Sequence, residues 1–373
     1  MGKKRGNAEG TVFQRRDGRW VATISLGGGR RKSFYGETRQ VVATKLNSAL
    51  KARADGLPVV AERQSVESFL AAWLDTAKQS IRPRTYEAYE LNVGRVSPYL
   101  GRVKLARLTP AQIQACYGAL LESGLSRRSV EQAHAVLHRA LRVAVMWGLI
   151  GRNPTDAVAV PRPERREMRT LTHQEVQRLF ASTSEDRFHP LWVLLTTTGV
   201  RIGEALGLRW SDVDADGGRV NIQRALQRQR GRGLVFVEPK SAASRRVVHL
   251  ARHTMDTLAL HRKRQLEERL TAGSAWHEGD LVFCRENGLP LENSTVRGVL
   301  RRALKRAELP IVRIHDLRHT AASLLLAGGV HPRVVQELLG HSTITLTLQT
   351  YSHTTPALHQ EAANQMDRLF RTA

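Results

Sequence analysis

A proline-rich stretch near the middle of the chain, NPTDAVAVPRPERREMRT at residues 153–170, most restricts how this sequence can fold. Each proline fixes its own backbone and lacks an amide donor, so no helix or central strand can run through the stretch. Three prolines with alternating charges are typical of an inter-domain linker, which we place at residues 156–168. The chain has 373 residues, more than one core usually supports, so two or three domains are expected.

The first 40 residues are strongly basic, with ten Lys or Arg against three Asp or Glu. An Asp-Gly pair at residues 17–18 and three glycines at residues 27–29 are turn signals, and three short strand-like runs surround them. A helical pattern follows, with Thr38 as its expected N-cap. Residues 1–56 are predicted to form a three-stranded sheet plus one helix, and a basic β-ribbon of this kind fits the major groove of DNA.

Residues 65–155 have helical spacing almost throughout. Ser65, Thr109 and Pro110 are start signals, and the four to five helices expected here predict a compact helical bundle. Basic residues recur near the helix starts, where phosphate contacts and simple solvation are both reasonable interpretations: Arg82, Arg84, Arg127 and Arg128.

Beyond the linker, residues 169–373 mix several helical patterns with three short strand-like runs, RVNIQRA, LVFVEP and RRVVHL. This region is predicted to be a mixed α+β domain that ends in a helix. The predicted fold class is therefore a multi-domain, mainly α-helical chain with small antiparallel β-sheets.

The net charge of the chain is +24 and its pI is about 11.2, which favours a polyanionic partner. An arginine-rich proteome would give the same imbalance without such a partner. Cys116 and Cys284 are far apart and lack metal-type spacing, as expected for reduced thiols in a cytosolic protein. The basic N-terminus is not followed by an apolar run, and no run approaches the length of a membrane span, so nucleic acid is favoured over a membrane.

Two candidate site residues come early in the last region. Arg201, in TTTGVRIGEALGLRW, stands at a helix start, where a cation is misplaced unless an anion binds there or Glu204 or Asp212 pairs with it. Lys240, in EPKSAASRRVVHL, lies in the turn between two strands. It is either an ordinary solvated lysine or a proton donor whose pKa is lowered by its site.

The other candidates come later, in RIHDLRHTAASLLLAGG and LLGHSTITLTLQTYSH. His315 and Arg318 are three residues apart, so they project from one helical face and can bind an anion and handle a proton. His315 also has zinc-type spacing with His319, but the glutamate of the metalloprotease pattern is missing. His341 and Tyr351, ten residues apart, are otherwise a helix cap and a core aromatic.

Together these side chains suit phosphoryl transfer to a tyrosine. Two arginines can hold the non-bridging oxygens of a phosphodiester under attack. A tyrosine hydroxyl, with a reference pKa of about 10, needs a base or strong positive charge to attack at neutral pH. The sequence contains no P-loop or magnesium-type acidic cluster, so we expect a reaction without metal, ATP or another cofactor.

The chain resembles the tyrosine recombinases of the phage integrase family along nearly its whole length. The resemblance rests on the segments TGVRIGEALGLRW, HDLRHTAAS and LLGHSTITLTLQTYSH, which bring the pattern Arg…Lys…His-x-x-Arg…His…Tyr in the family's order. It implies that Arg201 and Arg318 clamp the scissile phosphate, with Glu204 supporting the site. Lys240 would protonate the leaving 5′ oxygen, and His315 would serve the attacking tyrosine as base or hydrogen-bond partner.

The resemblance further implies that His341 hydrogen-bonds the phosphate and that Tyr351 forms a 3′-phosphotyrosine. The implied activity is site-specific recombination, in which a mobile genetic element is integrated and excised through a Holliday junction. A non-enzymatic DNA-binding protein, a chromosome-dimer resolvase and a type IB topoisomerase are the alternatives. The extra basic sheet disfavours a resolvase, and the complete set of six residues disfavours a binding protein.

The family's organisation implies an arm-type DNA-binding domain at residues 1–56, a core-binding domain at 65–155 and a catalytic domain at 169–373 with a C-terminal exchange helix. That helix would dock on a neighbouring protomer, although packing on its own domain is the alternative. The implied partners are double-stranded DNA at core-type and arm-type sites, three further protomers in a tetramer, a host DNA-bending protein and an excisionase. The implied location is the bacterial cytoplasm, at the nucleoid.

Overall fold

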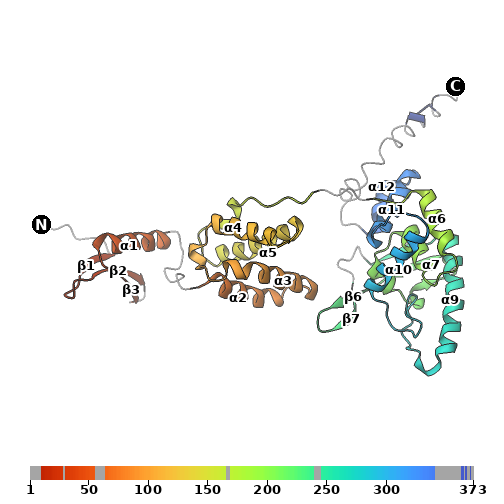
Figure 1. Cartoon of the computed structure of the whole chain (residues 1–373), viewed down its shortest axis with the longest axis horizontal. Coiled ribbons are helices and arrows are strands. Elements are labelled where there is room, and N and C mark those ends of the chain that lie inside the picture. Colours follow the sequence, from red (N-terminus) through yellow and green to blue (C-terminus); the bar gives the residue numbers. More distant parts are fainter. Residues whose placement is uncertain are drawn as a thin grey trace. The chain divides into compact units, whose positions relative to one another are not determined.

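The computed structural model describes residues 10–27, 30–54, 64–164, 169–238 and 245–340, and five positions near the C-terminus: Ala363, Asn364, Met366, Asp367 and Phe370. The chain divides into two compact units, Met1–Arg165 and Arg166–Ala373 (Figure 1). The predicted fold class, mainly helical with small antiparallel sheets, is confirmed. None of the helices in the described ranges has the length and apolar character needed to cross a bilayer.

The N-terminal part of the first unit is a three-stranded antiparallel sheet with one helix. Its strands are β1 (Thr11–Gln14), β2 (Trp20–Gly27) and β3 (Arg30–Gly36), in the order β1-β2-β3, and its helix is α1 (Arg39–Ala54). Thr38 accepts a hydrogen bond from the amide of Val41, as expected of an N-cap. Alternate β2 residues, Ala22 and Ile24, are buried with residues of β3 and α1, so this part has a small core of its own.

The second part of the first unit is a bundle of four α-helices: α2 (Val66–Lys78), α3 (Pro83–Leu100), α4 (Pro110–Glu122) and α5 (Arg127–Met146). Ser65, Thr109 and Ser126 cap three of these helices through their hydroxyls, which explains why each helix begins where the sequence indicates. The bundle surrounds an apolar core in which Trp73 stacks on Tyr89 with ring centroids 5.2 Å apart.

The chain that leaves the bundle stays attached to it for several residues. A 3₁₀ turn, η3 (Pro154–Ala157), follows α5, and Asp156 lies 3.0 Å from Nε2 of His138. The Asn153 side-chain amide donates to the carbonyl of His138, and the amide of Ala159 donates to the side chain of Gln114. The first residues of the proline-rich stretch therefore belong to the packed bundle.

The helices described for the second unit fall into two groups along the sequence, one before and one after its strands. The first group is α6 (His173–Thr183), α7 (His189–Thr198) and α8 (Ile202–Leu206), followed by the short turn η4 (Trp210–Asp212). The second group comes after the strands: α9 (Arg252–Ala272), the turn η6 (Gly273–Ala275), α10 (Asn293–Arg306), α11 (Ile314–Ala327) and α12 (Pro332–Leu339).

The second unit has five described strands: each of the three predicted strand-like runs contains one, and two more were not predicted. The five strands are β4 (Val213–Asp214), β5 (Arg219–Ile222), β6 (Ala225–Gln229), β7 (Gly233–Val237) and β8 (Arg246–His249). They form an antiparallel β4-β5-β8 sheet and a β6-β7 hairpin. Two residues of β4 are too few for a period-2 pattern, and β6, with the sequence ALQRQ, has none of the β-branched or aromatic residues that are enriched in strands.

Helix α9 was not predicted from the sequence. Its inner face is formed largely by polar side chains, Thr254, Thr257, His261 and Gln265, which are all buried. These positions have helical spacing, but they do not produce the apolar stripe by which an amphipathic helix is recognised. The helix is held by hydrogen bonds instead: His261 and Gln265 contact the carbonyl of Val282.

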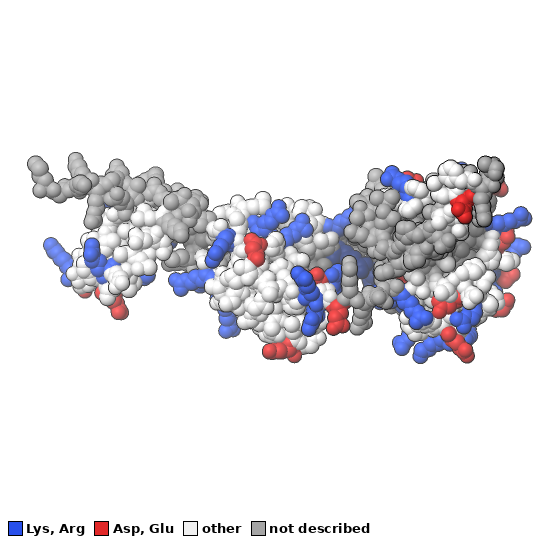
Figure 2. Space-filling model, turned by 90° about the horizontal axis from the view of Figure 1, so that it is seen from above, with Lys and Arg blue, Asp and Glu red and all other residues white. Residues whose placement is uncertain are grey.

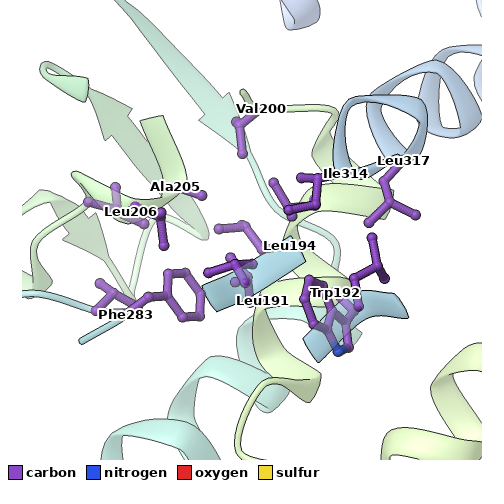
Figure 3. Close-up of a cluster of buried hydrophobic side chains, with 14 of the residues drawn as sticks. Leu191, Trp192, Leu194, Val200, Ala205, Leu206, Phe283, Ile314 and Leu317 are labelled. Carbon is purple, nitrogen blue, oxygen red and sulfur yellow. The ribbon is translucent and has the colours of Figure 1, made fainter. Parts of the chain in front are cut away.

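Helix α7 lies at the centre of the second unit and is buried almost all round. Its residues Leu191, Trp192 and Leu194 pack against Ile314 and Leu317 of α11 and against Phe283 (Figure 3). Helix α7 ends at Thr198, and Gly199 then adopts a left-handed conformation with φ 65°, so the helix predicted to start at Arg201 is separate from α7. The break lets Val200 and α8 turn back onto the same core.

Replacing Gly199 with alanine is expected to destabilise the chain more than the same change at Gly218. Both glycines have positive φ, which costs another residue about 1–2 kcal/mol. A Cβ at position 199 would lie 2.5 Å from the buried Leu339 side chain, whereas one at position 218 would meet no atom within 4 Å. Overpacking adds about 1–3 kcal/mol. Denaturant unfolding measures both variants, and equal losses contradict the packing argument.

Candidate active site

Arg201 stands at the N-cap of α8, in extended backbone conformation, and it is held there by Glu204. The amide of Arg201 donates to Oε2 of Glu204 over 3.0 Å, and Nη1 donates to Oε1 over 2.8 Å. The alternative partner, Asp212, pairs with Arg224 instead. Glu204 is buried, but 39% of the Arg201 side chain is exposed, so a salt bridge and an accessible cation coexist.

Arg318 lies on α11 and is only 3% exposed. Its Nη1 donates to the carbonyl of Gly199, and its Nη2 donates to the carbonyl of Leu339, both over 2.6 Å. Because a buried guanidinium is costly unless its N–H groups are satisfied, these bonds fix both its position and its plane. Arg318 is thereby tied to the chain just before Arg201 and to the end of α12.

Three arginines donate hydrogen bonds to the main-chain carbonyls of residues 338, 339 and 340, at the end of α12. We call these three carbonyls the α12 carbonyl cluster. Arg246 donates to the carbonyl of Leu338 over 2.8 Å, and Arg201 donates to that of Gly340 over 3.2 Å. Arg318 takes the middle carbonyl. The C-terminal end of a helix carries partial negative charge, so it gathers cations in this way. The structure thus brings the two predicted phosphate-binding arginines together.

Arg246 was not among the predicted site residues, although the sequence contains a signal for it. On β8, Arg246 shares a face with Val248, which is buried, and it pairs with Ile222, which is also buried. An arginine on the inner face of a strand needs a buried anion or carbonyl as partner. Its partners are Glu204 and Leu338, and only 8% of its side chain is exposed.

His315 lies in the first turn of α11, one turn before His319, and the two rings meet edge to face with centroids 4.8 Å apart. Burial lowers the pKa of His319 to about 4, and the neighbouring His315 adds to the shift. Desolvation also lowers the pKa of His315, and the positive charge of Arg318 lowers it further. Both imidazoles are therefore neutral at pH 7, which a proton acceptor requires.

The remaining predicted site residues, Lys240, His341 and Tyr351, lie outside the described residues. The described chain reaches Glu238 and resumes at Arg245, and these two residues form an ion pair of 2.9 Å. Within the described ranges, no group of three or more His, Cys, Asp or Glu is placed to hold a metal ion. His315 and His319, which have zinc-type spacing, therefore have no third metal ligand near them among the described residues.

Two family models match the chain. Residues 169–357 match the model described as "Phage integrase family", and residues 65–121 match "Phage integrase, N-terminal SAM-like domain". A relative named tyrosine recombinase XerC-like, from Caldanaerobacter subterraneus, is 30% identical and spans 91% of this chain and 92% of its own length. An integrase of Saccharopolyspora erythraea is 27% identical over 98% of this chain and 97% of its own.

Solved structures share the fold. The Tn1549 transposon integrase in complex with a circular intermediate DNA superposes with a TM-score of 0.71 at 23% identity, over 82% of this chain and 99% of that one. A lambda integrase tetramer bound to a Holliday junction gives 0.57 at 20% identity, over 93% of this chain and 96% of that one. The match to the lambda structure includes most of the N-terminal part of the chain.

Lowering the pH from about 6.5 to 4 is expected to destabilise the chain through His319. Because the folded pKa lies below the unfolded one, the unfolded state binds more protons in this window, and the free energy of unfolding falls as the pH falls. His319→Gln should reduce this slope relative to that of the unchanged chain. Denaturant midpoints at several pH values measure the slope, and an unchanged slope in His319→Gln contradicts the assignment.

Proposed function

The chain belongs to the phage integrase family, and from this premise we propose that Tyr351 is the residue with which it attacks DNA. The protein is a tyrosine-type site-specific recombinase, an enzyme that cleaves and rejoins DNA through a 3′-phosphotyrosine, and it serves the integration of a mobile genetic element. The family's activity does not by itself identify which side chains of this chain perform each step.

Arg201 and Arg318 are proposed to bind the non-bridging oxygens of the scissile phosphate. The observation that carries this proposal is their convergence on the α12 carbonyl cluster, which places two cations from distant parts of the sequence side by side. Negative charge grows on those oxygens as the phosphorus is attacked, so fixed guanidinium groups stabilise the transition state more than the ground state. The exposed part of Arg201 is where a phosphate can approach.

The proposed reaction conserves the energy of the phosphodiester bond. The Tyr351 oxygen attacks phosphorus while the bond to the 5′ oxygen breaks, and a phosphotyrosine forms on the 3′ side. His315, neutral at pH 7, receives the tyrosine proton or hydrogen-bonds the phenol, and Lys240 supplies a proton to the 5′ oxygen. His341 hydrogen-bonds the phosphate. Attack by a 5′ hydroxyl reverses the step, so no ATP is consumed.

The domain roles follow as proposals. Residues 1–56 would bind arm-type sites, residues 65–155 core-type sites, and residues 169–373 would hold the catalytic groups. The linker predicted at 156–168 would begin only after Ala159, because η3 and the hydrogen bond from the Ala159 amide hold the preceding residues on the bundle. Lys and Arg side chains are scattered over the surface shown in Figure 2, with Asp and Glu between them, and the net charge of +24 suits long contact with phosphates.

Assembly on DNA is proposed to be tetrameric. Met366 and Phe370, four residues apart in the C-terminal segment, are 55% and 76% exposed, as expected for an exchange helix that docks on another protomer. The lambda integrase tetramer on a Holliday junction has the same fold and supports this state. We further propose a host DNA-bending protein and an excisionase as partners, and the bacterial cytoplasm, at the nucleoid, as location.

Tyr351→Phe is expected to abolish covalent attachment to DNA and to leave binding nearly unchanged, because only the attacking oxygen is lost. The substrate is a nicked duplex carrying the element's core site, taken from the junctions that flank the integrated element. A denaturation-resistant protein–DNA band reports cleavage, and a salt-sensitive mobility shift reports binding. Tyr99→Phe, at a surface tyrosine of α3, is the matched control. A covalent band with Tyr351→Phe assigns the nucleophile elsewhere.

A further inference from the structure

Glu204 is bound by two arginines, and only one of them belongs to the proposed phosphate clamp. Its Oε1 accepts from Arg201, and its Oε2 accepts from Nη2 of Arg246 over 2.9 Å. The carboxylate is 4% exposed and the Arg246 side chain 8%, so water contributes little to their solvation. An interaction between charges is strongest in such surroundings.

The charge balance of this cluster depends on Arg246. Without Arg246, the buried carboxylate would face Arg201 alone, and the pair would be close to neutral when seen from a phosphate. With Arg246 present, two guanidinium groups share one carboxylate, so a net positive charge remains on the exposed member, Arg201. Glu204 can then orient Arg201 without cancelling its charge.

The pKa of Glu204 agrees with the view that Arg246 compensates most of its charge. Burial pushes the pKa of the Glu204 carboxyl upward, but the hydrogen bond and charge of Arg246, together with those of Arg201, outweigh burial and hold the pKa below its usual range. Arg246 exerts the larger effect of the two arginines. The carboxylate is therefore ionised at neutral pH, and most of its compensation comes from Arg246.

Arg246 also holds the end of α12. Its Nε donates to the carbonyl of Leu338 while its Nη2 holds Glu204, so one planar guanidinium joins α8 to the α12 carbonyl cluster. The other two carbonyls of that cluster bind Arg318 and Arg201. Movement of Arg246 would thus disturb both members of the clamp.

We propose that Arg246 is a positioning residue for strand cleavage, which compensates the charge of Glu204 and so keeps Arg201 directed and charged toward the scissile phosphate. This proposal rests on the recombinase activity and on the clamp role of Arg201 proposed above. Arg246 does not itself touch the reacting atoms in this account. It acts through Glu204 and through the α12 carbonyl cluster.

The test compares two nicked core-site duplexes that differ only at the scissile position, one with phosphate and one with methylphosphonate, which lacks one charged oxygen. Arg246→Gln is expected to slow covalent-complex formation on phosphate roughly 10- to 100-fold, the kinetic equivalent of losing one or two hydrogen bonds between charged groups. The loss on methylphosphonate should be about tenfold smaller, because less charge requires stabilisation there. The ratio of the rate on phosphate to the rate on methylphosphonate therefore falls in Arg246→Gln.

Arg187→Gln is the matched control. Arg187 forms an ion pair with Glu268, in which Nε donates to Oε1 over 2.5 Å and Nη2 donates to Oε2 over 2.7 Å. The two side chains are 17% and 18% exposed. Its loss lowers stability in the same unit without touching Glu204 or the α12 carbonyl cluster. The ratio of the two rates should stay at the wild-type value in this variant, and denaturant unfolding checks that both variants are folded during the assay.

Arg246→Lys keeps the charge but cannot hold Glu204 and Leu338 with one planar group, so it should lower the ratio less than the glutamine variant. If Arg246→Gln does not fold, the lysine variant decides the question by the same ratio. A wild-type ratio in either folded variant overturns the positioning role. Absence of a covalent complex with the unchanged protein on phosphate would instead overturn the proposed nucleophile and its reaction.

Discussion

The burial of α7 is the constraint on which the second unit depends. A helix that is buried almost all round must be covered on every side, and α6, α8, α9 and α11 cover α7. Its end is fixed as firmly as its middle, because Gly199 turns the chain against Leu339. Arg201, which follows, is therefore placed by packing, and the carbonyl of Gly199 accepts a hydrogen bond from Arg318.

The candidate site concentrates positive charge in a place where burial would normally forbid it. The fold solves this with main-chain acceptors and one carboxylate: the ends of α7 and α12 offer carbonyls, and Glu204 offers two oxygens. Main-chain dipoles satisfy the N–H groups of a guanidinium without removing its net charge. A cluster built in this way is satisfied before substrate arrives, yet it remains attractive to a phosphate.

The features that could be predicted from the sequence are those marked by residues close together along the chain. Helix starts at Ser65 and Thr109 follow hydroxyl caps. Arg201, His315 and Arg318 became candidates because a sequence motif orders them. Polar cores leave no such signal, which is why α9 was missed. The local signal for Arg246, a charge on the inner face of a strand, shows that it needs a buried partner but does not identify the partner. That partner, Glu204, lies more than 40 residues earlier, and pairings over such a distance are set by the tertiary fold.

The hydrogen bonds that hold the start of the proline-rich stretch shorten the tether between the units. The amide of Ala159 is anchored to the bundle, and the amide of Leu171 is bonded to Thr320 in the second unit. The chain between those two amides can extend to roughly 40 Å at most. A tether of that length gives an effective concentration in the millimolar range. Under the DNA-binding roles proposed for the two units, capture of DNA by the second unit is an intramolecular event once the first has bound.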